Sequence, residues 1–553
     1  MTARADLHVH SKHSNRPTEY LLRRLGAAES YREPLAIYRT ARERGMDFVT
    51  ITDHDAISGA LEIAHLPGTF VSVESTVAFP EDGCQIHLLV FGITEPQFDE
   101  IERLRGNIYE LRDYLRSEGI LCSVAHPFFR VNERLTLAHL EKLLVLFDRF
   151  ETINGVHDAG VGDRVREIVS SLTPDRAFEL VDRHGIEPWS TTPWRKSFTG
   201  GSDDHCGRFA ACAWTETPPV ADAFSFLSHL RAGNAKPGGT RGSSARLVES
   251  LVAIAAEDLD RRLPRLALGA RRDPLARTLF DLAREIPRLG TEAIESAIAE
   301  ALARFGSQVA HDVSRGRFGH ALGRVGSLAP LAAALAPFLI AVKAQNKDRD
   351  LVRAASERFG CGAIERPRTL WIAESEADLA APPPVLRKIA APEALETMVV
   401  GSCAESVSLC VHQFAPLKRV PFDFGSEEGP IELRVPPFLK VVEFVERERF
   451  SEIVVSSSGL SGLLGLAVAR LLSIPLVACP RADLASRVGA ATGELFLEEL
   501  ASGYERWFLH RADRIVVASR FERERWLARG IAAERIEVAA NEFVGEFAHA
   551  EVA

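Results

Sequence analysis

Short apolar runs in the first 205 residues repeatedly lead into a histidine or an acidic residue, and this pattern constrains the fold more than any other feature. The clusters are Asp6-Leu7-His8-Val9-His10, Thr52-Asp53-His54-Asp55, Glu74, His87, His126-Pro127 and Gly201-Ser202-Asp203-Asp204-His205. Side chains two residues apart on a strand project from the same face, so His8 and His10 can reach one ion. Several strand ends that present side chains at one mouth are typical of a parallel α/β barrel.

The side chains in these clusters are imidazoles and carboxylates, without cysteine. Such ligands suit zinc, manganese or iron, and several of them together can hold two or three ions that activate a water molecule. A single His-x-His is a weak signal, and Ala125-His126-Pro127 alone is more typical of a capped or loop histidine. The recurrence of the pattern favours a multinuclear metal site.

In order and spacing, residues 4–240 resemble the polymerase-and-histidinol-phosphatase (PHP) metallohydrolases. The resemblance implies a distorted seven-stranded (β/α) barrel with a trinuclear cluster that hydrolyses phosphoesters. By position, one ion is expected on His8, His10, Glu74 and Asp203, a second on Glu74, His87 and His126, and a third on His54 and His205. A metal-bridged hydroxide would attack phosphorus while the remaining cations neutralise the other oxygens, so Glu74 and Asp203 are also counted as catalytic.

The chain departs from the PHP pattern after the His-x-His motif. The family usually has an aspartate there, whereas this chain has Ser14-Asn15-Arg16. A neutral amide oxygen binds a transition ion more weakly than a carboxylate does. Either the third ion is loosely held beside Asn15, or His13 substitutes for it; His13 is equally well explained as an exposed loop residue.

Other polar residues near the motifs are candidates for supporting roles. Asp55 and Asp204 follow predicted ligands and are expected to orient them or to shuttle a proton, although helix capping would also explain Asp55. Recognition of the substrate phosphate is assigned to bases near the motifs, namely Lys12, Arg195, Lys196 and Arg208.

Length and composition limit the remaining possibilities. A chain of 553 residues is expected to form two or three domains. The formal charge of −10 argues against broad nonspecific binding of nucleic acid. The eight cysteines form no Cys-x-x-Cys motif and no secretory signal opens the chain, so the reducing cytoplasm is the expected location.

The predicted domains are a metallohydrolase barrel over residues 1–243, a helical packing segment over 244–367 and a third domain over 368–553. The Pro/Gly-rich stretch 235–242 closes the first domain, and apolar residues then recur with helical spacing. The run 328–342 is nearly free of polar groups. It is shorter than a bilayer span and is interrupted by Pro330 and Pro337, which favours a buried helix pair over peripheral membrane contact.

Apolar runs in the third domain predict buried parallel strands at 369–373, 397–400, 452–455, 475–478, 514–517 and 535–538. Helical periodicity at 462–472 and 520–528 separates some of them. This alternation predicts a Rossmann-like, doubly wound domain.

Residues 368–543 resemble the acceptor-side domain of GT-B-type retaining glycosyltransferases. The resemblance rests on 512–519, on 527–536, on Pro436-Pro437-Phe438 and on the segments near Val454 and Ile474. Three departures argue against sugar transfer. The first turn reads Glu374-Ser375-Glu376-Ala377-Asp378 and not a glycine-rich phosphate turn, Cys479-Pro480-Arg481 stands where a histidine is expected, and the chain ends at Ala553, where the donor domain should begin.

Three hypotheses follow. The first is a metal-dependent phosphoesterase whose glycosyltransferase-like domain serves in docking or substrate recognition, with a phosphorylated small molecule, a nucleotide or a nucleic-acid end as substrate. The second is half of a split glycosyltransferase whose donor domain is a separate protein, with the PHP barrel accessory. The third is a non-catalytic scaffold. No transmembrane span is expected, and the sequence leaves the oligomeric state open.

Overall fold

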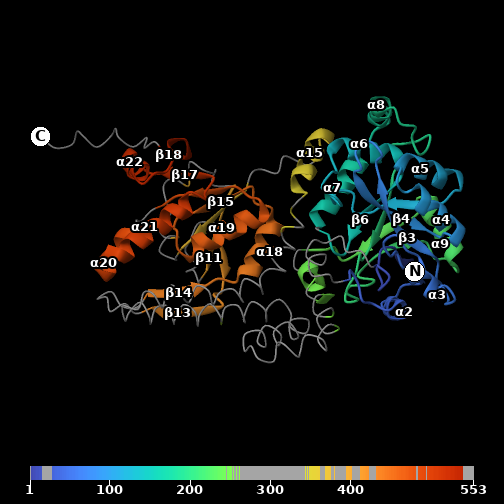
Figure 1. Cartoon of the computed structure of the whole chain (residues 1–553), viewed down its shortest axis with the longest axis horizontal. Helices are drawn as coiled ribbons and strands as arrows, with labels where there is room; N and C mark the ends of the chain where they lie inside the picture. Colours follow the sequence, from blue (N-terminus) through green and yellow to red (C-terminus); the bar gives the residue numbers. More distant parts are fainter. Residues whose placement is uncertain are drawn as a thin grey trace, which may run out of the picture. The chain divides into compact units, whose positions relative to one another are not determined.

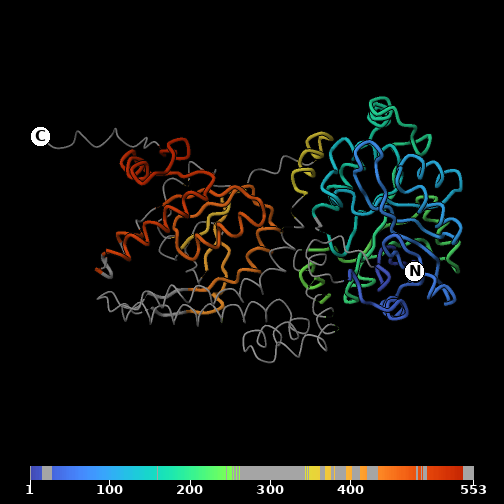
Figure 2. The backbone as a smooth tube through the Cα atoms, viewed as in Figure 1, coloured from blue at the N-terminus to red at the C-terminus, as the bar shows by residue number. Residues whose placement is uncertain are grey.

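The computed structural model describes most of the chain outside its middle segment. It covers residues 2–14, 28–157, 159–243, 246–251, 348–361, 368–374, 394–400, 411–422, 431–480, 484–493 and 495–539, with the isolated residues 253, 254, 257, 261, 300, 343, 346, 379 and 386. Contacts divide the chain into two compact units (Figures 1 and 2). Unit 1 comprises Met1–Arg288 and Ala336–Ala363, and unit 2 comprises Leu289–Leu335 and Ile364–Ala553.

Unit 1 contains two β-sheets. The first has the order β2-β1-β8-β9 and consists of β1 (Ala3–Asp6), β2 (Phe48–Val49), β8 (Ala213–Thr217) and β9 (Lys236–Gly239). The second has the order β3-β4-β5-β6-β7 and consists of β3 (Ser72–Ala78), β4 (Gln85–Phe91), β5 (Leu121–Val124), β6 (Arg149–Asn154) and β7 (Ser197–Gly201). Strands β1 and β2 run parallel, as do β5, β6 and β7, whereas β4 is antiparallel to both of its neighbours.

Backbone hydrogen bonds beyond the strand ends join the two sheets. On one side, the amide of Glu74 in β3 donates to the carbonyl of Asp53 after β2 (3.3 Å), and the amide of Asp55 donates to the carbonyl of Glu74 (2.9 Å). On the other side, the amide of Asp203 donates to the carbonyl of His8 (2.6 Å). Within the described residues the strand ladders themselves form two open sheets and not a closed barrel, so the distorted seven-stranded barrel stays a prediction.

The helices of unit 1 lie around these strands (Figure 1). They are α2 (Pro34–Glu43), α3 (Ser58–Ile63), α4 (Glu95–Leu104), α5 (Ile108–Ser117), α6 (Leu137–Leu146), α7 (Ala159–Ser170), α8 (Pro174–His184) and α9 (Ala223–Arg231). Polar caps fix several starting points: the side chains of Asn107, Thr173 and Asp222 accept hydrogen bonds from the first turns of α5, α8 and α9.

Three apolar clusters hold the sheets and helices of unit 1 together. One contains Ala5 and Phe48 from the first sheet and Leu89 and Leu121 from the second, so it joins the two sheets. Another packs β4 and β5 against α4 to α8. The third packs Val49 of β2 against Ile37 and Ala41 of α2 and Ala60 of α3.

One helix from far along the chain also belongs to unit 1. Helix α15 (Arg349–Phe359) places Leu351, Ala355 and Phe359 in the same cluster as α6 and α7 (Figure 2). The guanidinium of Arg358 donates to Glu141 of α6 at 2.7 Å. Most of the predicted helical segment 244–367, including the apolar run 328–342, lies outside the described residues.

Unit 2 is built on a seven-stranded parallel sheet with the order β12-β11-β10-β15-β16-β17-β18. The strands are β10 (Thr369–Ala373), β11 (Leu395–Val400), β12 (Val411–Phe414), β15 (Glu452–Val455), β16 (Leu476–Ala478), β17 (Arg514–Val517) and β18 (Ile536–Val538). The order reverses between β10 and β15, as in doubly wound folds. The predicted parallel α/β sheet is therefore confirmed, and β13 (Lys418–Phe422) and β14 (Ile431–Val435) form a separate antiparallel pair.

The helices of unit 2 follow its strands. They are α18 (Phe438–Glu448), α19 (Leu460–Leu472), α20 (Leu484–Thr492), α21 (Leu495–Leu509) and α22 (Arg520–Ala528), with a 3-10 turn η4 at Ala533–Arg535. Helix α19 lies close against the sheet at Gly465, where a Cβ atom would stand 2.4 Å from Val455 Cγ1 and 3.2 Å from Ile372 Cδ1. The sequence expectation of helices at 462–472 and 520–528 is confirmed by α19 and α22.

Among the described residues, no helix is both long and apolar enough to cross a membrane.

Candidate metal centre

All eight predicted ligands come together at one edge of unit 1. His8 and His10 follow β1, His54 follows β2, Glu74 lies in β3, His87 in β4, His126 after β5, and Asp203 and His205 after β7. Two of these positions have a left-handed backbone, with φ of 25° at His126 and 51° at Asp203. Non-glycine residues rarely adopt such conformations, and they concentrate at functional sites.

The carboxylate of Glu74 lies at the centre of the cluster, with no exposed surface. Five imidazoles face it. Its Oε2 atom is 3.0 Å from His8 Nε2, 3.2 Å from His10 Nε2 and 3.2 Å from His54 Nδ1, and its Oε1 atom is 3.0 Å from His87 Nδ1 and 3.1 Å from His126 Nε2. A carboxylate in this position can bridge two or more cations.

Asp203 closes the other side of the cluster. Its Oδ1 atom is 3.3 Å from His8 Nε2 and 3.4 Å from His10 Nε2. Gly201, two residues earlier, makes this approach possible, because a Cβ atom there would lie 2.4 Å from the Cβ atom of His8. The predicted set of His8, His10, Glu74 and Asp203 thus forms one contiguous group.

Several buried nitrogens in the cluster lack a hydrogen bond within the described part of the chain. They are His10 Nε2, His54 Nδ1, both ring nitrogens of His87, and His205 Nε2. A buried polar atom without a partner is costly unless an ion or water occupies the space beside it. Five groups of three such side chains have potential ligand atoms within 4.8 Å of one another: His8–His10–Asp203, His8–Glu74–His126, His54–Glu74–His87, His10–His54–His205 and His126–His157–Asp203. The donor set fits transition-metal ions.

The electrostatics of the cluster also fit cations. Burial alone would raise the pKa of Glu74, but the charge of His8 and the neighbouring imidazoles outweighs it and holds that pKa well below its usual range. Burial opposes protonation of His10, yet Asp203 and Glu74 raise the pKa of His10 to about 10. The pKa of His8 is raised as well, whereas burial lowers the pKa values of His54 and His205. Protons on His8 and His10 thus balance the buried carboxylates, and metal ions can replace protons in this role.

Two groups near the cluster were not predicted from the sequence. Glu29 is buried, with its carboxylate oxygens 3.4 Å from His54 Nε2 and 3.8 Å from His205 Nε2. His157, which follows β6, lies with its Nε2 atom 3.5 Å from Asp203 Oδ2. His157 repeats the pattern of a histidine after a strand and could have been found by it, whereas Glu29 follows no such run.

A further carboxylate contacts the predicted ligands on the side of His8 away from Glu74. Glu151 of β6 is buried; its Oε1 atom is 2.9 Å from His8 Nδ1, and its Oε2 atom accepts hydrogen bonds from the backbone of His126 and the amide of Asn154, both at 2.9 Å. The other nitrogen of His8 faces Glu74. Such a contact fixes the orientation and tautomer of a ligating imidazole.

The predicted proton shuttles face away from the cluster. Asp55 accepts a hydrogen bond from the amide of Thr76 (2.7 Å) and pairs with Arg105 (3.0 Å). Asp204 accepts from the amides of Cys206 (3.1 Å) and Ala210 (2.9 Å). These contacts hold the loops after β2 and β7, so a part in proton transfer stays a prediction.

The bases proposed for phosphate recognition are not among the described residues that line the pocket over the cluster. Lys12 pairs with Glu33 at 2.7 Å, and the carbonyl of Arg208 accepts a hydrogen bond from Arg44. Lys196, next to Arg195, is buried and pairs with Asp148 at 2.9 Å near the start of β7. Substrate contact by Lys12, Arg195 and Arg208 remains a prediction.

The structure describes only part of the predicted site of the third ion. His13 lies with its Nε2 atom 2.7 Å from Glu62 Oε1, and the metal-capable groups do not include it. Asn15 lies outside the described residues. Glu29, between His54 and His205, offers the carboxylate that the sequence pattern lacked.

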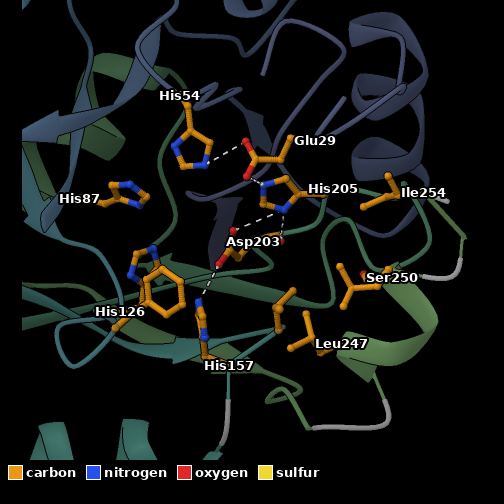
Figure 3. Close-up of a pocket in the computed structure, with 13 residues that line it drawn as sticks. Glu29, His54, His87, His126, His157, Asp203, His205, Leu247, Ser250 and Ile254 are labelled. Carbon is orange, nitrogen blue, oxygen red and sulfur yellow. Dashed lines mark hydrogen bonds and ion pairs between the residues drawn. The ribbon is translucent and has the colours of Figure 1, made fainter. Parts of the chain in front are cut away.

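A pocket opens over the cluster (Figure 3). It is lined by Glu29, His54, His87, His126, His157, Asp203 and His205, and by Phe129, Val156, Leu247, Ser250, Leu251 and Ile254. Leu247, Ser250 and Ile254 lie opposite His54, His87 and His126 in Figure 3. The pocket thus has a largely apolar wall that lies opposite three of the predicted ligands.

Comparison with known proteins supports the prediction of a glycosyltransferase-like domain in the C-terminal region. Residues 397–542 match the family model of the glycosyl transferase 4-like domain. This match covers most of the described part of unit 2, which is therefore a glycosyltransferase-like domain.

Three other similarities extend over nearly the whole length of the similar protein. Uncharacterized protein MJ1587 of Methanocaldococcus jannaschii is 26% identical over 178 residues, which is 32% of this chain and 96% of that protein. The crystal structure of PsfC from Pseudomonas syringae is similar to 47% of this chain over 99% of its own, with 12% identity and a TM-score of 0.29. A "putative metal-dependent phosphoesterase" from Bifidobacterium adolescentis is similar to 41% of this chain over 96% of its own, with 15% identity and a TM-score of 0.22.

Proposed function

We propose that unit 1 is a PHP-type, metal-dependent phosphoesterase, with its strands arranged as the distorted seven-stranded barrel of that family. The observation that carries this proposal is the buried carboxylate of Glu74, which five imidazoles face at 3.0 to 3.2 Å. Such a centre has the ligands for several divalent ions of zinc, manganese or iron.

The ligands divide among two or three ions. His8, His10, Glu74 and Asp203 would hold the first ion, and Glu74, His87 and His126 the second. His54 and His205 would hold a third ion, for which Glu29 supplies a carboxylate within 3.4 and 3.8 Å of their ring nitrogens. When bound, such ions activate a water molecule and neutralise the phosphoryl oxygens.

The chain itself supplies positioning and a sheltered site. Glu151 orients His8, and Asn154 donates a hydrogen bond to Asp203 at 3.0 Å, which keeps the Asp203 carboxylate turned toward the cluster. His157 stands at the pocket, 3.5 Å from the same carboxylate. It is the histidine available to hold or deliver a proton near the leaving group.

Elemental analysis and a phosphoester screen test this proposal together. Purified protein is expected to carry two or three transition-metal ions per chain, and His126→Ala and Asp203→Ala should lose both metal and hydrolysis. His65→Ala changes an exposed histidine and should leave both intact. A metal-free chain after gentle purification, or hydrolysis that survives both ligand substitutions, would rule out this site.

We further propose that unit 2 serves docking or substrate recognition. Its switch point between β10 and β15 is where doubly wound domains bind ligands. There Glu374 accepts a hydrogen bond from Ser457, and a Cβ atom on Gly459 would lie 2.6 Å from Glu374 Oε1. A carboxylate beside the first turn of α19 repels the phosphates of a nucleotide-sugar donor.

The split-transferase alternative rests on the glycosyltransferase-like match of residues 397–542. Titration calorimetry with nucleotide sugars distinguishes the two roles. Under the docking proposal no binding to the full chain is expected. Binding of a nucleotide sugar by the full chain, or transfer in the presence of a separate donor-domain protein, would favour the alternative.

A further inference from the structure

The wall of the pocket opposite the ligands is apolar. The helical turn 246–251 and Ile254 beyond it contribute Leu247, Leu251 and Ile254. These three side chains are 6%, 2% and 3% exposed, so the wall is sheltered from solvent. Val156 and Phe129 extend this apolar surface toward His157.

Polar groups near this wall are engaged elsewhere. The hydroxyl of Ser250 donates to Cys206 Sγ at 3.4 Å. The guanidinium of Arg246 donates to the carbonyl of Gly155 and lies 4.9 Å over the ring of Phe209. Of the described residues that line this pocket, none is lysine or arginine. Among the described residues on this side, no side chain therefore matches a second anionic group or a set of hydroxyls.

An aromatic surface continues the apolar wall at the ligand side. The ring of Phe129 lies 5.2 Å from the ring of His126 and 4.8 Å from that of His157, measured between centroids. A flat apolar group entering the pocket would contact aliphatic side chains on one side and these rings on the other. Such contacts favour aromatic ligands.

We propose that the substrate is a small phosphoester whose leaving group is apolar, aromatic in preference to aliphatic, and that Leu247, Leu251 and Ile254 select it. This inference rests on the proposed function. Hydrolysis forms a bond from phosphorus to a water oxygen, breaks the bond to the leaving oxygen and passes one water proton to the departing alcohol. A sugar or glycerol leaving group would place hydroxyls against carbon, which is costly without hydrogen-bond partners.

The test compares benzyl phosphate with glycerol 3-phosphate on the metal-loaded full chain. Both release an alkoxide of similar basicity, so their kcat/KM ratio reports contact with the leaving group. A ratio of about tenfold or more in favour of benzyl phosphate is expected from burial of the ring. A ratio near one, or a preference for glycerol 3-phosphate, would overturn the inference while leaving the phosphoesterase proposal intact.

Two matched variants locate the preference. Leu251→Thr, which places a hydroxyl in the wall, is expected to lower the ratio about fivefold or more, mainly through the KM for benzyl phosphate. Leu351→Thr makes the same change at an equally buried leucine of α15, away from the pocket, and should lower the melting temperature without changing the ratio. Equal ratios in all three proteins would show that this wall does not select the substrate.

Binding of phosphonates supplies a readout that needs no turnover. Benzylphosphonate should bind the metal-loaded chain about tenfold or more tightly than methylphosphonate, and Leu251→Thr should remove most of this difference. If no ester is hydrolysed, the proposed function fails, and the phosphonate comparison still decides the role of the wall. Equal affinities for the two phosphonates would overturn it.

Discussion

At the scale of single residues, Glu74 shows how a buried acid can be tolerated. Burial raises the free energy of its charged form, and the five imidazoles around it offset that cost. The same imidazoles are then unable to pack as apolar groups. Because the cluster depends on this balance of charge, we expect it to be sensitive to the loss of a single carboxylate.

Glu29 gives the first prediction at this scale. Glu29→Gln replaces a carboxylate between His54 and His205 by a weaker neutral ligand. We expect one fewer ion per chain after dialysis, with the remaining ions retained, as measured by elemental analysis. Glu33→Gln, at an exposed residue paired with Lys12, is the control and should keep the full number. An unchanged metal count in Glu29→Gln would exclude Glu29 as a ligand.

Glu151 gives the second prediction at the scale of single residues. Glu151→Gln removes the charge that faces His8 Nδ1 and one acceptor for the amides of His126 and Asn154. Metal affinity should fall about 10- to 100-fold, as for other residues that orient a metal-binding imidazole. Competition with a chromophoric chelator measures this. Glu141→Gln changes an equally buried carboxylate away from the cluster, and its metal affinity should match that of the unmodified chain.

The sequence alone could predict which residues meet at the site, but only in part. His8, His54, His126 and Asp203 were found because each follows an apolar run, and the structure brings them together. Their binding of ions stays a prediction. Glu29 and Glu151 were missed because their roles depend on contacts with residues far along the chain, and Glu151 sits inside β6, where it resembles any strand residue.

At the scale of elements, α15 is attached to unit 1 by charge as well as by apolar packing. Glu141 of α6 accepts a hydrogen bond from Arg358 at 2.7 Å, and its other oxygen lies 2.9 Å from His184 Nε2. Burial would raise the pKa of Glu141, but Arg358 and His184 outweigh it, so the pKa lies below the ordinary value of 4.5. The pair therefore stabilises the docking of α15 only while Glu141 is charged.

This pair predicts a pH dependence. Since the pKa of Glu141 is lower in the folded state than in the unfolded state, its contribution is present above pH 4.5 and is lost as pH falls through the folded-state pKa. Glu141→Gln should cost about 1–3 kcal/mol in the free energy of unfolding at neutral pH, and this deficit should shrink in acid. Urea unfolding of unit 1 at neutral and acidic pH measures it.

An exposed carboxylate serves as the control for α15. Glu167→Gln on α7 removes only a surface pair with Arg164 and should change stability by less than about 1 kcal/mol at either pH. A deficit of Glu141→Gln that stays constant from neutral to acidic pH would contradict the proposed role of its charge.

The strands of unit 2 were predictable from the sequence where both faces of the strand are buried. The segments 369–373, 452–455 and 514–517 are apolar runs in the middle of a parallel sheet, and all three are strands in the structure. Strand β12 was missed because it lies at the sheet edge, where its residues are half-buried or exposed and mixed in polarity. The antiparallel β8 and β9 were missed because neither is an apolar run: β8 alternates buried with half-buried residues, and β9 reads Lys236-Pro237-Gly238-Gly239.

At the scale of the whole molecule, the candidate metal ligands and the glycosyltransferase-like match lie in different units. Every metal-capable group among the described residues belongs to unit 1, and the glycosyltransferase-like match lies in unit 2. A ligand that binds only the folded form of one unit stabilises that unit alone. Metal ions should therefore act on one part of the chain and leave the other unchanged.

Calorimetry of the full chain tests this division. We expect two unfolding transitions, one of which falls by several degrees or more on removal of metal with a chelator, because an ion at a thousandfold excess over its Kd contributes about 4 kcal/mol. Asp203→Ala should lower the same transition and make it insensitive to the chelator. The other transition, assigned to unit 2, should respond to neither change, and Trp371→Phe in the core of β10 should shift it alone. If the chelator moves both transitions, or neither, the ions do not belong to unit 1 alone.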